Sequence, residues 1–504
     1  MSKSHLTVSL YLWLKYLLRS SVVFLFLLPV FFVLHGFVRN YGAVEATDAA
    51  LLVAFYIFII LIIGAIGWLF YRDIPKASFF AFFIMSYHFF FGVIQDTLTD
   101  IAPHTIFVQY RFLLPASCLL FLVTLIWLKK RTKPLFTWTA YLNILFIVLI
   151  LIDTGGVIVK SIRPEQRSSL LFKEGFSICD TCSKPNVYFI LLDEYASNES
   201  LKKLFNFDNS AFEDELNRRG FHISKRSNSN YNKTLFSMAS ALNMDYLGRE
   251  VYPTSRSNVS YAYGMIRNSN VVNLFNRHGY KFYNLSLFDF PGQPAHKYAE
   301  FLPYGTELIT KQTFISRLKK AIRTDILSGK IPIPSVQEKI LYGYLNFNDD
   351  IFNLTKEVAA EKSSAPKFVY AHFMMPHFPY YFDSKGNPVS KEKLKRFAEF
   401  SPHDYVEYLQ YSNGKILTLL DDIFAKSSAM PVIILLGDHG FRYAVKKANR
   451  QFDFSNLNAI YLPGKNYNQF SDDMSNVNFF RIFFNTSFNQ HFTLLKDSTF
   501  NCWD

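Results

Sequence analysis

The sequence predicts two parts, an N-terminal α-helical membrane domain with about five spans and an α/β domain whose mainly parallel sheet is sandwiched by helices. The first third of the 504-residue chain is dominated by Phe, Leu, Ile and Val, whereas the remainder is rich in Asn, Ser, Tyr and Lys. In that remainder, short apolar runs alternate with helix-like segments. We therefore expect a membrane domain at residues 1–155, a connector at 156–184 and an outer domain at 185–504.

The membrane domain is predicted from apolar stretches that are long enough to cross a bilayer, which takes about 20 residues. They are Tyr16–Val38, Ala49–Tyr71, Ala77–Ile94, Arg111–Leu128 and Leu135–Ile152. The first stretch is too long for a removable signal peptide and lacks a small-residue cleavage site. We expect it to stay in the protein as an anchor.

The charges of the short loops predict the orientation of the spans. Basic residues gather before the first span, after the second and after the fourth: Lys3, Lys15, Arg19, Arg72, Lys76, Lys129, Lys130, Arg131 and Lys133. The alternate loops hold fewer basic residues and more acidic ones: Arg39, Arg111, Glu45, Asp48, Asp96 and Asp100. The positive-inside rule then places the N-terminus in the cytoplasm and everything after Asp153 outside.

The formal net charge of +13 does not indicate a nucleic-acid partner. Part of this charge belongs to the basic loops, and the rest forms no basic stripe. A basic exterior close to anionic lipid head groups is the better physical explanation.

Four cysteines carry little functional information. Cys118 falls within the fourth span and is expected to be a small core residue. Cys179 and Cys182 form a CxxC pair before the outer domain, and Cys502 lies at the far end. Outside the cytoplasm we expect a structural disulfide, with the pairing left open.

Five apolar runs of the outer domain have the length and composition of strands. They are Asn186–Leu192, Lys281–Leu287, Phe368–Phe373, Val432–Leu436 and Asn458–Leu462. Helix-like segments such as Tyr405–Phe424 lie between them. This alternation predicts a mainly parallel sheet with helices on its faces.

Acidic and histidine side chains follow three of these strands. Asp193 comes directly after the first strand, His377 follows the third, and Asp438 and His439 follow the fourth. Each alone is more often a cap, a turn residue or a structural histidine. Because parallel strands end at one edge of a sheet, where α/β proteins bind ligands, their coincidence indicates a common site. Carboxylate and imidazole suit zinc or manganese better than calcium.

The segment 228–243 (NSNYNKTLFSMASALN) supplies a candidate nucleophile. We expect Thr234 at or just before the N-terminus of a helix, where free N–H groups and the helix dipole favour anionic oxygens. The alternative is an ordinary threonine N-cap. A metal within bonding reach would favour loss of the hydroxyl proton and make the oxygen a usable nucleophile.

With the order Asp193, Thr234, His377 and Asp438-His439, the chain resembles the alkaline phosphatase superfamily in its membrane-anchored sulfatase-like branch. That branch includes lipoteichoic acid synthases and the phosphoethanolamine transferases that modify lipid A. Their layout is also similar, with several membrane spans, a connector and one outer catalytic domain. The resemblance covers essentially the whole length, although the anchor is matched only by architecture.

The resemblance implies roles for the metal-binding residues. Asp193 would be the first acidic ligand, Thr234 the nucleophile that also contacts the metal, and Asp438 with His439 the second ligand pair. Glu194 is an alternative first ligand, and Asp193 is favoured because it directly follows the strand.

The resemblance also implies substrate contacts. The spacing of His372 and His377 in AHFMMPHFPYYF is similar to that of the transferases' paired substrate histidines, which would contact the phosphoryl group or protonate the leaving alcohol. After the Asp-His-Gly motif the transferases carry Glu, whereas this chain has Phe441-Arg442, so Arg442 is a candidate phosphate clamp. The formylglycine signature of true sulfatases is absent around Thr234, which disfavours sulfate-ester hydrolysis.

Together with these features, the resemblance implies a metal-dependent phosphoryl transferase, anchored in the bacterial cytoplasmic (inner) membrane with its catalytic domain on the periplasmic or extracellular side. It would move a phospholipid-derived head group, of phosphoethanolamine or phosphoglycerol type, to an envelope glycan or lipid through a phospho-threonine intermediate. One divalent ion, zinc or manganese, is expected. The alternatives are a phosphate- or sulfate-ester hydrolase of envelope glycans and an inactive scaffold relative.

Overall fold

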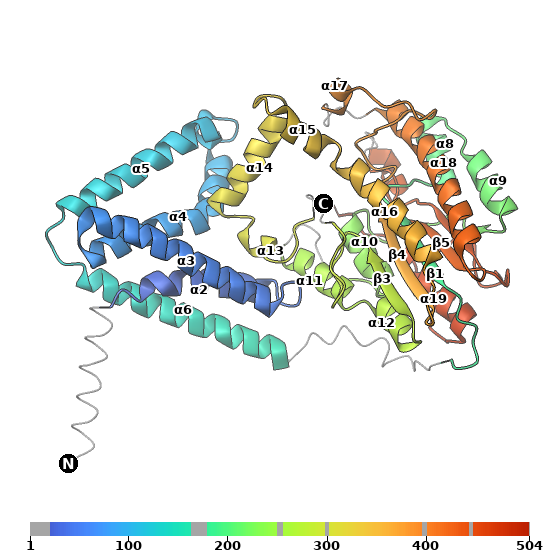
Figure 1. Cartoon of the computed structure of the whole chain (residues 1–504), viewed down its shortest axis with the longest axis horizontal. Helices are drawn as coiled ribbons and strands as arrows, with labels where there is room; N and C mark the ends of the chain where they lie inside the picture. The colour runs from blue at the N-terminus through green and yellow to red at the C-terminus, as the bar shows by residue number, and fades with distance from the viewer. Residues whose placement is uncertain are drawn as a thin grey trace, which may run out of the picture. The chain divides into compact units, whose positions relative to one another are not determined.

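The computed structural model describes residues 21–162, 179–248, 256–297, 302–395, 401–442 and 447–502. The chain forms two compact units (Figure 1). Unit 1 comprises Met1–Glu165 and Pro303–Asp325, and unit 2 comprises Gln166–Leu302 and Ile326–Asp504. The chain therefore leaves unit 2 once, contributes a short segment to unit 1, and returns. This segment falls within the range expected for the outer domain.

Unit 1 is built from apolar helices. They are α2 (Phe24–Arg39), α3 (Ala46–Tyr71), α4 (Ile74–Ile101), α5 (Tyr110–Lys130) and α6 (Phe136–Ile162), together with the short 3-10 helix η1 (Ile106–Val108). In the described part of the chain, four helices, α3 to α6, are long and apolar enough to cross a membrane. Helix α2 has 16 residues and is shorter. The expected count of five therefore differs by one, because the expected first span begins at Tyr16 and residues 1–20 lie outside the described residues.

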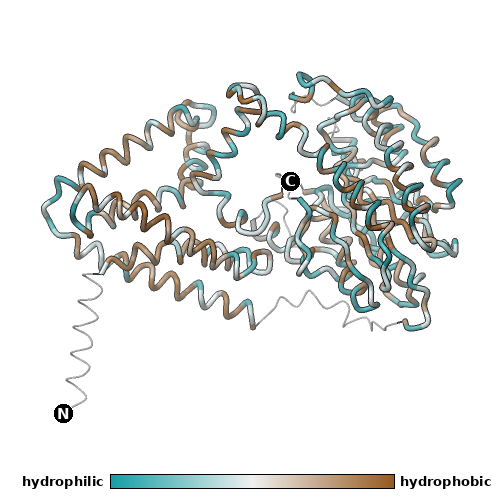
Figure 2. The backbone as a smooth tube through the Cα atoms, viewed as in Figure 1, coloured by the Kyte–Doolittle hydropathy of each residue, from teal (hydrophilic) through white to brown (hydrophobic). Residues whose placement is uncertain are grey.

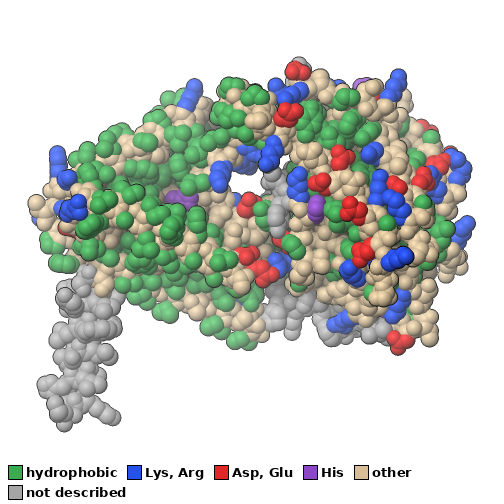
Figure 3. Space-filling view, viewed as in Figure 1, with side chains coloured by type: hydrophobic (Ala, Val, Ile, Leu, Met, Phe, Trp, Pro, Cys, Tyr) green, Lys and Arg blue, Asp and Glu red, His purple; other side chains and the backbone are tan. Residues whose placement is uncertain are grey.

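The helices of unit 1 expose many apolar side chains and therefore require an apolar environment. Figure 2 shows them as predominantly hydrophobic, and Figure 3 shows hydrophobic side chains over much of their surface. On α3 alone, Leu51 is 69% exposed and Phe58 is 59% exposed. A helix that is apolar all round and exposes such side chains suits a lipid bilayer, so these helices anchor the protein in a membrane.

Polar contacts connect the apolar helices to one another. The Asn143 side chain accepts a hydrogen bond from the Phe24 N–H at 2.6 Å and donates one to the Ser21 carbonyl at 2.8 Å. The Tyr87 and Ser117 hydroxyls lie 2.5 Å apart. Such buried polar pairs compensate for the missing hydrophobic driving force between helices in lipid.

The segment that returns to unit 1 contains α13 (Glu307–Thr310) and α14 (Phe314–Leu327). The expected connector begins within α6, which continues to Ile162, and residues 163–178 lie outside the described residues. Cys179 and Cys182 are joined by a disulfide, whereas Cys118 and Cys502 are free thiols.

Unit 2 is an α/β domain with a six-stranded sheet in the order β2-β6-β5-β1-β4-β3. The strands are β1 (Val187–Leu192), β2 (His222–Ile223), β3 (Lys281–Leu285), β4 (Lys367–Phe373), β5 (Val432–Gly437) and β6 (Asn458–Tyr461). Strands β5, β1, β4 and β3 are parallel, and β6 is antiparallel to both β5 and β2. The expected mainly parallel sheet is confirmed, and the two-residue strand β2 was not predicted because it is too short to show a pattern.

Helices cover both faces of the sheet (Figure 1). They are α8 (Asn198–Phe205), α9 (Ser210–Arg218), α10 (Thr234–Ala241), α11 (Arg256–Arg267), α12 (Asn270–Arg277), α15 (Pro334–Leu341), α16 (Gly343–Ala360), α17 (Lys391–Leu394), α18 (Pro402–Lys426) and α19 (Asn476–Phe488), with the 3-10 helix η3 (Lys447–Asp453). Side chains alternate across β4, so that Phe368 stacks on Phe275 of α12 while Phe373 packs on Phe352 of α16. The expected helix sandwich is confirmed.

The register of the central strands aligns their carboxyl ends. Leu192, the last residue of β1, is paired with Phe373 of β4 and with Gly437 of β5. All three strands are buried along their whole length. The residues that follow these strands therefore emerge side by side at one edge of the sheet.

Candidate metal centre

Asp193 is the first residue after β1. Its N–H donates a hydrogen bond to the Phe373 carbonyl at 3.0 Å, which continues the β1–β4 ladder by one residue. The side chain is fully buried, and its Oδ2 lies 3.3 Å from Nε2 of His372. Its Oδ1 is buried and accepts no hydrogen bond from the described residues. A buried carboxylate oxygen without a donor is costly, so this atom is suited to a positively charged ligand.

Asp438 and His439 lie in the turn that follows β5. The Oδ1 atom of Asp438 accepts hydrogen bonds from the N–H groups of Glu194 at 2.8 Å and His439 at 2.9 Å. In His439, Nδ1 lies 2.8 Å from the Gly440 carbonyl, and Nε2 lies 3.1 Å from Oδ2 of Asp438. With the proton on Nδ1 donated to that carbonyl, the Nε2 lone pair is available to a metal.

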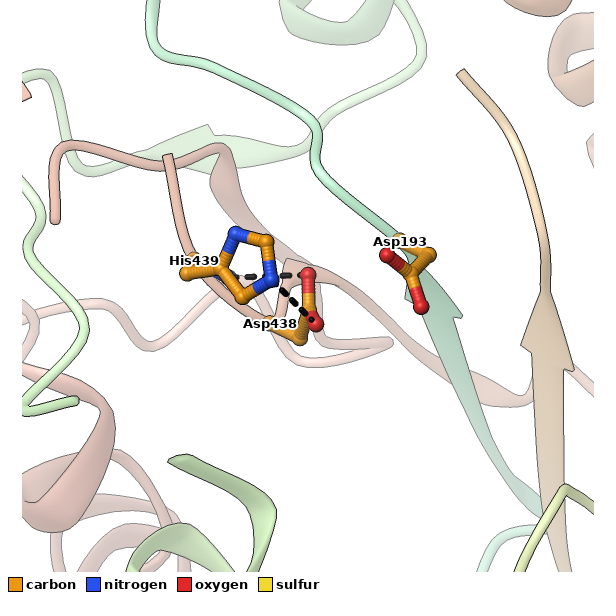
Figure 4. Close-up of side chains that lie close together, drawn as sticks. All are labelled: Asp193, Asp438 and His439. Atoms are coloured by element: carbon orange, nitrogen blue, oxygen red, sulfur yellow. Dashed lines mark hydrogen bonds and ion pairs between the residues drawn. The ribbon is translucent and has the colours of Figure 1, made fainter. Parts of the chain in front are cut away.

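These three residues form a compact group of possible ligands (Figure 4). One ligand atom from each of Asp193, Asp438 and His439 lies within 4.8 Å of the others, and all three side chains are buried. Two carboxylates and one imidazole are suitable donors for a divalent transition metal. The unpartnered Oδ1 of Asp193 fits this assignment. The chain thus has a residue group that could hold a divalent cation.

Asp438 and His439 are electrostatically coupled. Burial raises the pKa of Asp438, but the charge and hydrogen bond of His439, with bonds from Glu194 and Thr234, hold the pKa well below its ordinary value. Burial and Arg442 lower the pKa of His439, whereas Asp438 and Asp193 raise it, and the net shift is upward. Both shifts favour the charged form of each side chain, so a metal at this position would compete with a proton for the imidazole.

Thr234 lies beside this group at the start of α10. The helix begins at Thr234, and Lys233 occupies the N-cap position without a side-chain capping bond. The Thr234 hydroxyl lies 3.5 Å from Nε2 of His439, and the residue is 4% exposed. One turn later, Ser237 donates its hydroxyl proton to the Asp438 carbonyl at 2.5 Å. Thr234 is therefore not the N-cap, and its hydroxyl faces the candidate ligands.

Glu194 occupies a different environment from Asp193. Its backbone has φ of 62°, a left-handed conformation that is costly for a residue with a side chain. Its Oε1 accepts a hydrogen bond from the Arg442 N–H at 3.4 Å and lies 3.6 Å from the guanidinium Nε of Arg442. Its buried Oε2 accepts no hydrogen bond from the described residues. The compact group contains Asp193, and the Glu194 carboxylate is paired with Arg442.

The two histidines expected to contact substrate lie in different places. His372 is within β4, fully buried, and contacts Asp193. In the structure it is positioned to orient that carboxylate. His377 follows β4, is 6% exposed, and stacks on the ring of Phe378, while its Nδ1 lies 2.6 Å from the Phe378 carbonyl. His377 does not belong to the three-residue group found among the described residues.

Two residues near the centre were not predicted from the sequence. Asp453 ends η3, and its carbonyl accepts the Gly440 N–H at 2.9 Å. Asn232 donates to Oδ2 of Asp453 at 3.4 Å and to the Asn501 side chain at 3.0 Å, and accepts the Cys502 N–H at 2.8 Å. This asparagine joins the loop before Thr234 to the C-terminal tail. The sequence carries no spacing signal that would identify either residue.

Asp453 is expected to make stability depend on pH. Burial raises its pKa to about 6, against the lowering effects of Asn232, His439 and Arg442. Folding therefore takes up a proton between the ordinary carboxyl pKa and about 6, so the stability of unit 2 falls as pH rises through that window. Asp453→Asn, which resembles the protonated form, should stabilise the metal-free protein at pH 8 by about 1–2 kcal/mol, after allowance for solvent screening.

The measurement is urea unfolding of the full chain in detergent with EDTA, from pH 4 to pH 8. The increase in the free energy of unfolding caused by Asp453→Asn should shrink toward zero at the acid end, where the wild-type carboxyl is also protonated. Asp214→Asn, at an exposed position of α9, should change little at any pH. A stabilisation by Asp453→Asn that is equal at all pH values would contradict the assignment.

The fold and the site together define a class, an α/β unit with a candidate metal centre at the carboxyl edge of its sheet, joined to apolar membrane helices. Residues 186–491 match the family model described as Sulfatase. The chain therefore belongs to the sulfatase family of the alkaline phosphatase superfamily, and it is a sulfatase-like enzyme, as expected. No match is found among curated protein sequences.

Several solved structures are similar to this chain. The integral membrane lipooligosaccharide phosphoethanolamine transferase A of Neisseria meningitidis has 12% identity and a TM-score of 0.35, with 90% of this chain and 94% of that chain covered. The C-terminal periplasmic domain of Escherichia coli EptC in complex with Zn has 11% identity and a TM-score of 0.38, with coverage of 62% and 84%. A protein of the alkaline phosphatase superfamily from Vibrio parahaemolyticus has 16% identity and a TM-score of 0.33, with coverage of 60% and 66%.

Proposed function

We propose that this protein is a metal-dependent phosphoryl transferase that acts at the outer surface of the bacterial cytoplasmic membrane. One observation carries the proposal: a buried threonine hydroxyl at the start of a helix, 3.5 Å from the imidazole of a three-residue group that could hold a metal. A hydroxyl in that position has both a group that can activate it and helix N–H groups that favour phosphoryl oxygens.

Asp193, Asp438 and His439 would hold one divalent ion, zinc or manganese, with the Thr234 oxygen as a further ligand. When bound, such an ion lowers the pKa of a neighbouring hydroxyl and balances negative charge on phosphoryl oxygens. His372, 3.3 Å from Asp193, would keep that carboxylate oriented.

Side chains of the protein carry out the two bond-forming steps of the transfer. The Thr234 hydroxyl gives up its proton to water and its oxygen attacks the phosphorus of a phospholipid phosphodiester, a Thr–O–P bond forms, and the bond to the diacylglycerol oxygen breaks. His377 protonates that leaving oxygen, and Arg442 binds phosphoryl oxygens. In the second half an acceptor hydroxyl attacks the same phosphorus and gives up its proton to His377, and the Thr–O–P bond breaks to leave the Thr234 alkoxide, which attacks the next donor.

The anchor supports the proposed donor. Apolar helices in the same chain keep the catalytic unit near phospholipids, whose head groups, of phosphoethanolamine or phosphoglycerol type, are the proposed donor. An envelope glycan or lipid is the proposed acceptor. The charges of the loops support an N-terminus in the cytoplasm and a catalytic unit on the periplasmic or extracellular side.

The test is intact-mass analysis of the full chain in nanodiscs that contain phosphatidylethanolamine and phosphatidylglycerol, with zinc or manganese added. We expect a mass gain equal to one phosphoethanolamine or phosphoglycerol group and release of diacylglycerol. A folded, metal-loaded protein that shows neither product but hydrolyses a soluble phosphate ester would overturn transfer in favour of hydrolysis. A folded protein with no adduct and no bound metal would favour the scaffold alternative.

A further inference from the structure

The segment that returns to unit 1 is docked on α4 by several contacts. The Gly92 N–H donates to the Gln312 carbonyl at 2.9 Å. The Arg317 guanidinium donates to both carboxylate oxygens of Asp96, at 2.6 and 2.8 Å. The ring of Phe314 packs edge-on against Phe91 with 4.8 Å between centroids. A backbone hydrogen bond, a bidentate ion pair and an aromatic contact thus hold the start of α14 on α4.

Two glycines of the apolar helices make room for this segment. A Cβ at Gly36 of α2 would lie 2.5 Å from Cγ2 of Ile309, and a Cβ at Gly92 of α4 would lie 2.6 Å from the Gln312 carbonyl oxygen. Either distance is too short for a side chain. The close approach of the segment to two different helices therefore depends on glycine at both positions. The segment is closely packed within unit 1.

The docking points lie at the outer ends of both helices. Gly36 is near the C-terminal end of α2, and Gly92 and Asp96 are near that of α4. The loops after these helices are the ones with few basic residues, which the positive-inside rule places outside. Helix α14 therefore starts at the level where the outer hydrocarbon boundary meets the lipid head groups.

The outward face of α14 carries isoleucines and lysines. Ile315 is 51% exposed and Ile322, two turns later on the same face, is 40% exposed. Lys319, which lies between the two isoleucines on this face, and Lys320 beside it are also exposed. Phe314 and Arg317, which dock on α4, point from the other side of the helix. Exposed isoleucines next to lysines are typical of a helix that lies in a membrane interface.

We infer that α14 is an interfacial helix that inserts Ile315 and Ile322 at the acyl-chain boundary and binds anionic phospholipid head groups through Lys319 and Lys320. Its docking points place the start of the helix at that boundary, and its lysines complement anionic phosphates. The inference goes beyond the proposed function, because it concerns a lipid-binding surface and holds whatever reaction occurs at Thr234.

Site-specific quenching tests the insertion in full-length protein in nanodiscs. Ile322→Cys and the control Thr324→Cys, an exposed position on the opposite side of α14, are made with Cys118→Ser and Cys502→Ser and labelled with a fluorophore. Lipids with a quencher at the upper acyl chain should quench the label at 322 at least about threefold more than the label at 324. Aqueous iodide should show the reverse order. Equal quenching at the two positions, or stronger iodide quenching at 322, would overturn the inference.

A second measurement tests the head-group contact without relying on insertion. Fluorescent phosphatidylglycerol at low density in phosphatidylcholine nanodiscs should be enriched next to the protein, as measured by energy transfer. Lys319→Gln with Lys320→Gln should halve that enrichment or more, whereas Lys385→Gln, exposed in unit 2, should not. Unchanged enrichment would overturn the lipid contact. A change of oligomeric state with Ile315→Glu and no change in enrichment would assign the surface to a second copy of the chain.

Discussion

Thr234→Ala is expected to lower the rate of phosphoryl transfer by at least about a thousandfold and to remove the covalent phosphoenzyme. The Thr234 oxygen is the atom that would form the bond to phosphorus, and Lys233 and Leu235 beside it offer no hydroxyl. The fold should persist, because the hydroxyl is not the helix cap and α10 is still held by Ser237. The measurement is diacylglycerol release and intact mass, in the same nanodiscs for both proteins.

Two control variants make this result specific. Thr234→Ser keeps a hydroxyl at the same position and should retain activity within about tenfold, with the adduct shifted to serine. Ser240→Ala removes another buried hydroxyl of α10, one that donates to the Asp245 carbonyl, and should keep the adduct. If Thr234→Ala still carries the adduct, another residue is the nucleophile and the proposed mechanism is wrong.

Asp438→Asn is expected to reduce the affinity for zinc or manganese by at least about a hundredfold. The substitution is nearly isosteric, and an amide oxygen can still accept the two N–H bonds from Glu194 and His439. What it removes is the negative charge that faces His439 and that would partner the cation. The change therefore separates the ligand role of Asp438 from its structural role in the turn.

The readout is metal content per chain after dialysis against a weak chelator, together with calorimetric titration of the metal-free protein. Asp421→Asn, an exposed carboxylate that pairs with Arg219, serves as the matched control and should bind metal like the wild type. A folded Asp438→Asn protein with unchanged metal affinity would show that the ion binds elsewhere, and the candidate centre would have to be abandoned.

The sequence by itself determined the features that depend on local composition. Long apolar stretches predicted α3 to α6, because a bilayer-spanning helix needs a continuous apolar run. Short buried runs predicted β1, β4 and β5, and an acidic residue directly follows β1 and β5. For the same reason Asp193, Asp438 and His439 could be selected as possible ligands, since a charged residue at the end of a buried strand is visible in the sequence alone.

Only the tertiary structure decided which of these residues meet. The pairing of Leu192 with both Phe373 and Gly437 sets the three strand ends at one level, and a shift of register would separate the ligand atoms. The Glu194 carboxylate lies beside Arg442, and the Glu194 backbone is left-handed; composition predicts neither feature.

The remaining features depend on contacts between residues far apart in the chain. Asn232 meets Asp453 and the C-terminal tail across more than two hundred residues. The return of residues 303–325 to the apolar helices depends on two glycines that look unremarkable in the sequence. Local patterns report burial and secondary structure, whereas such contacts depend on strand register and on close packing between distant segments. The sequence thus determined the architecture and the candidate ligands, and the tertiary structure decided how they are assembled.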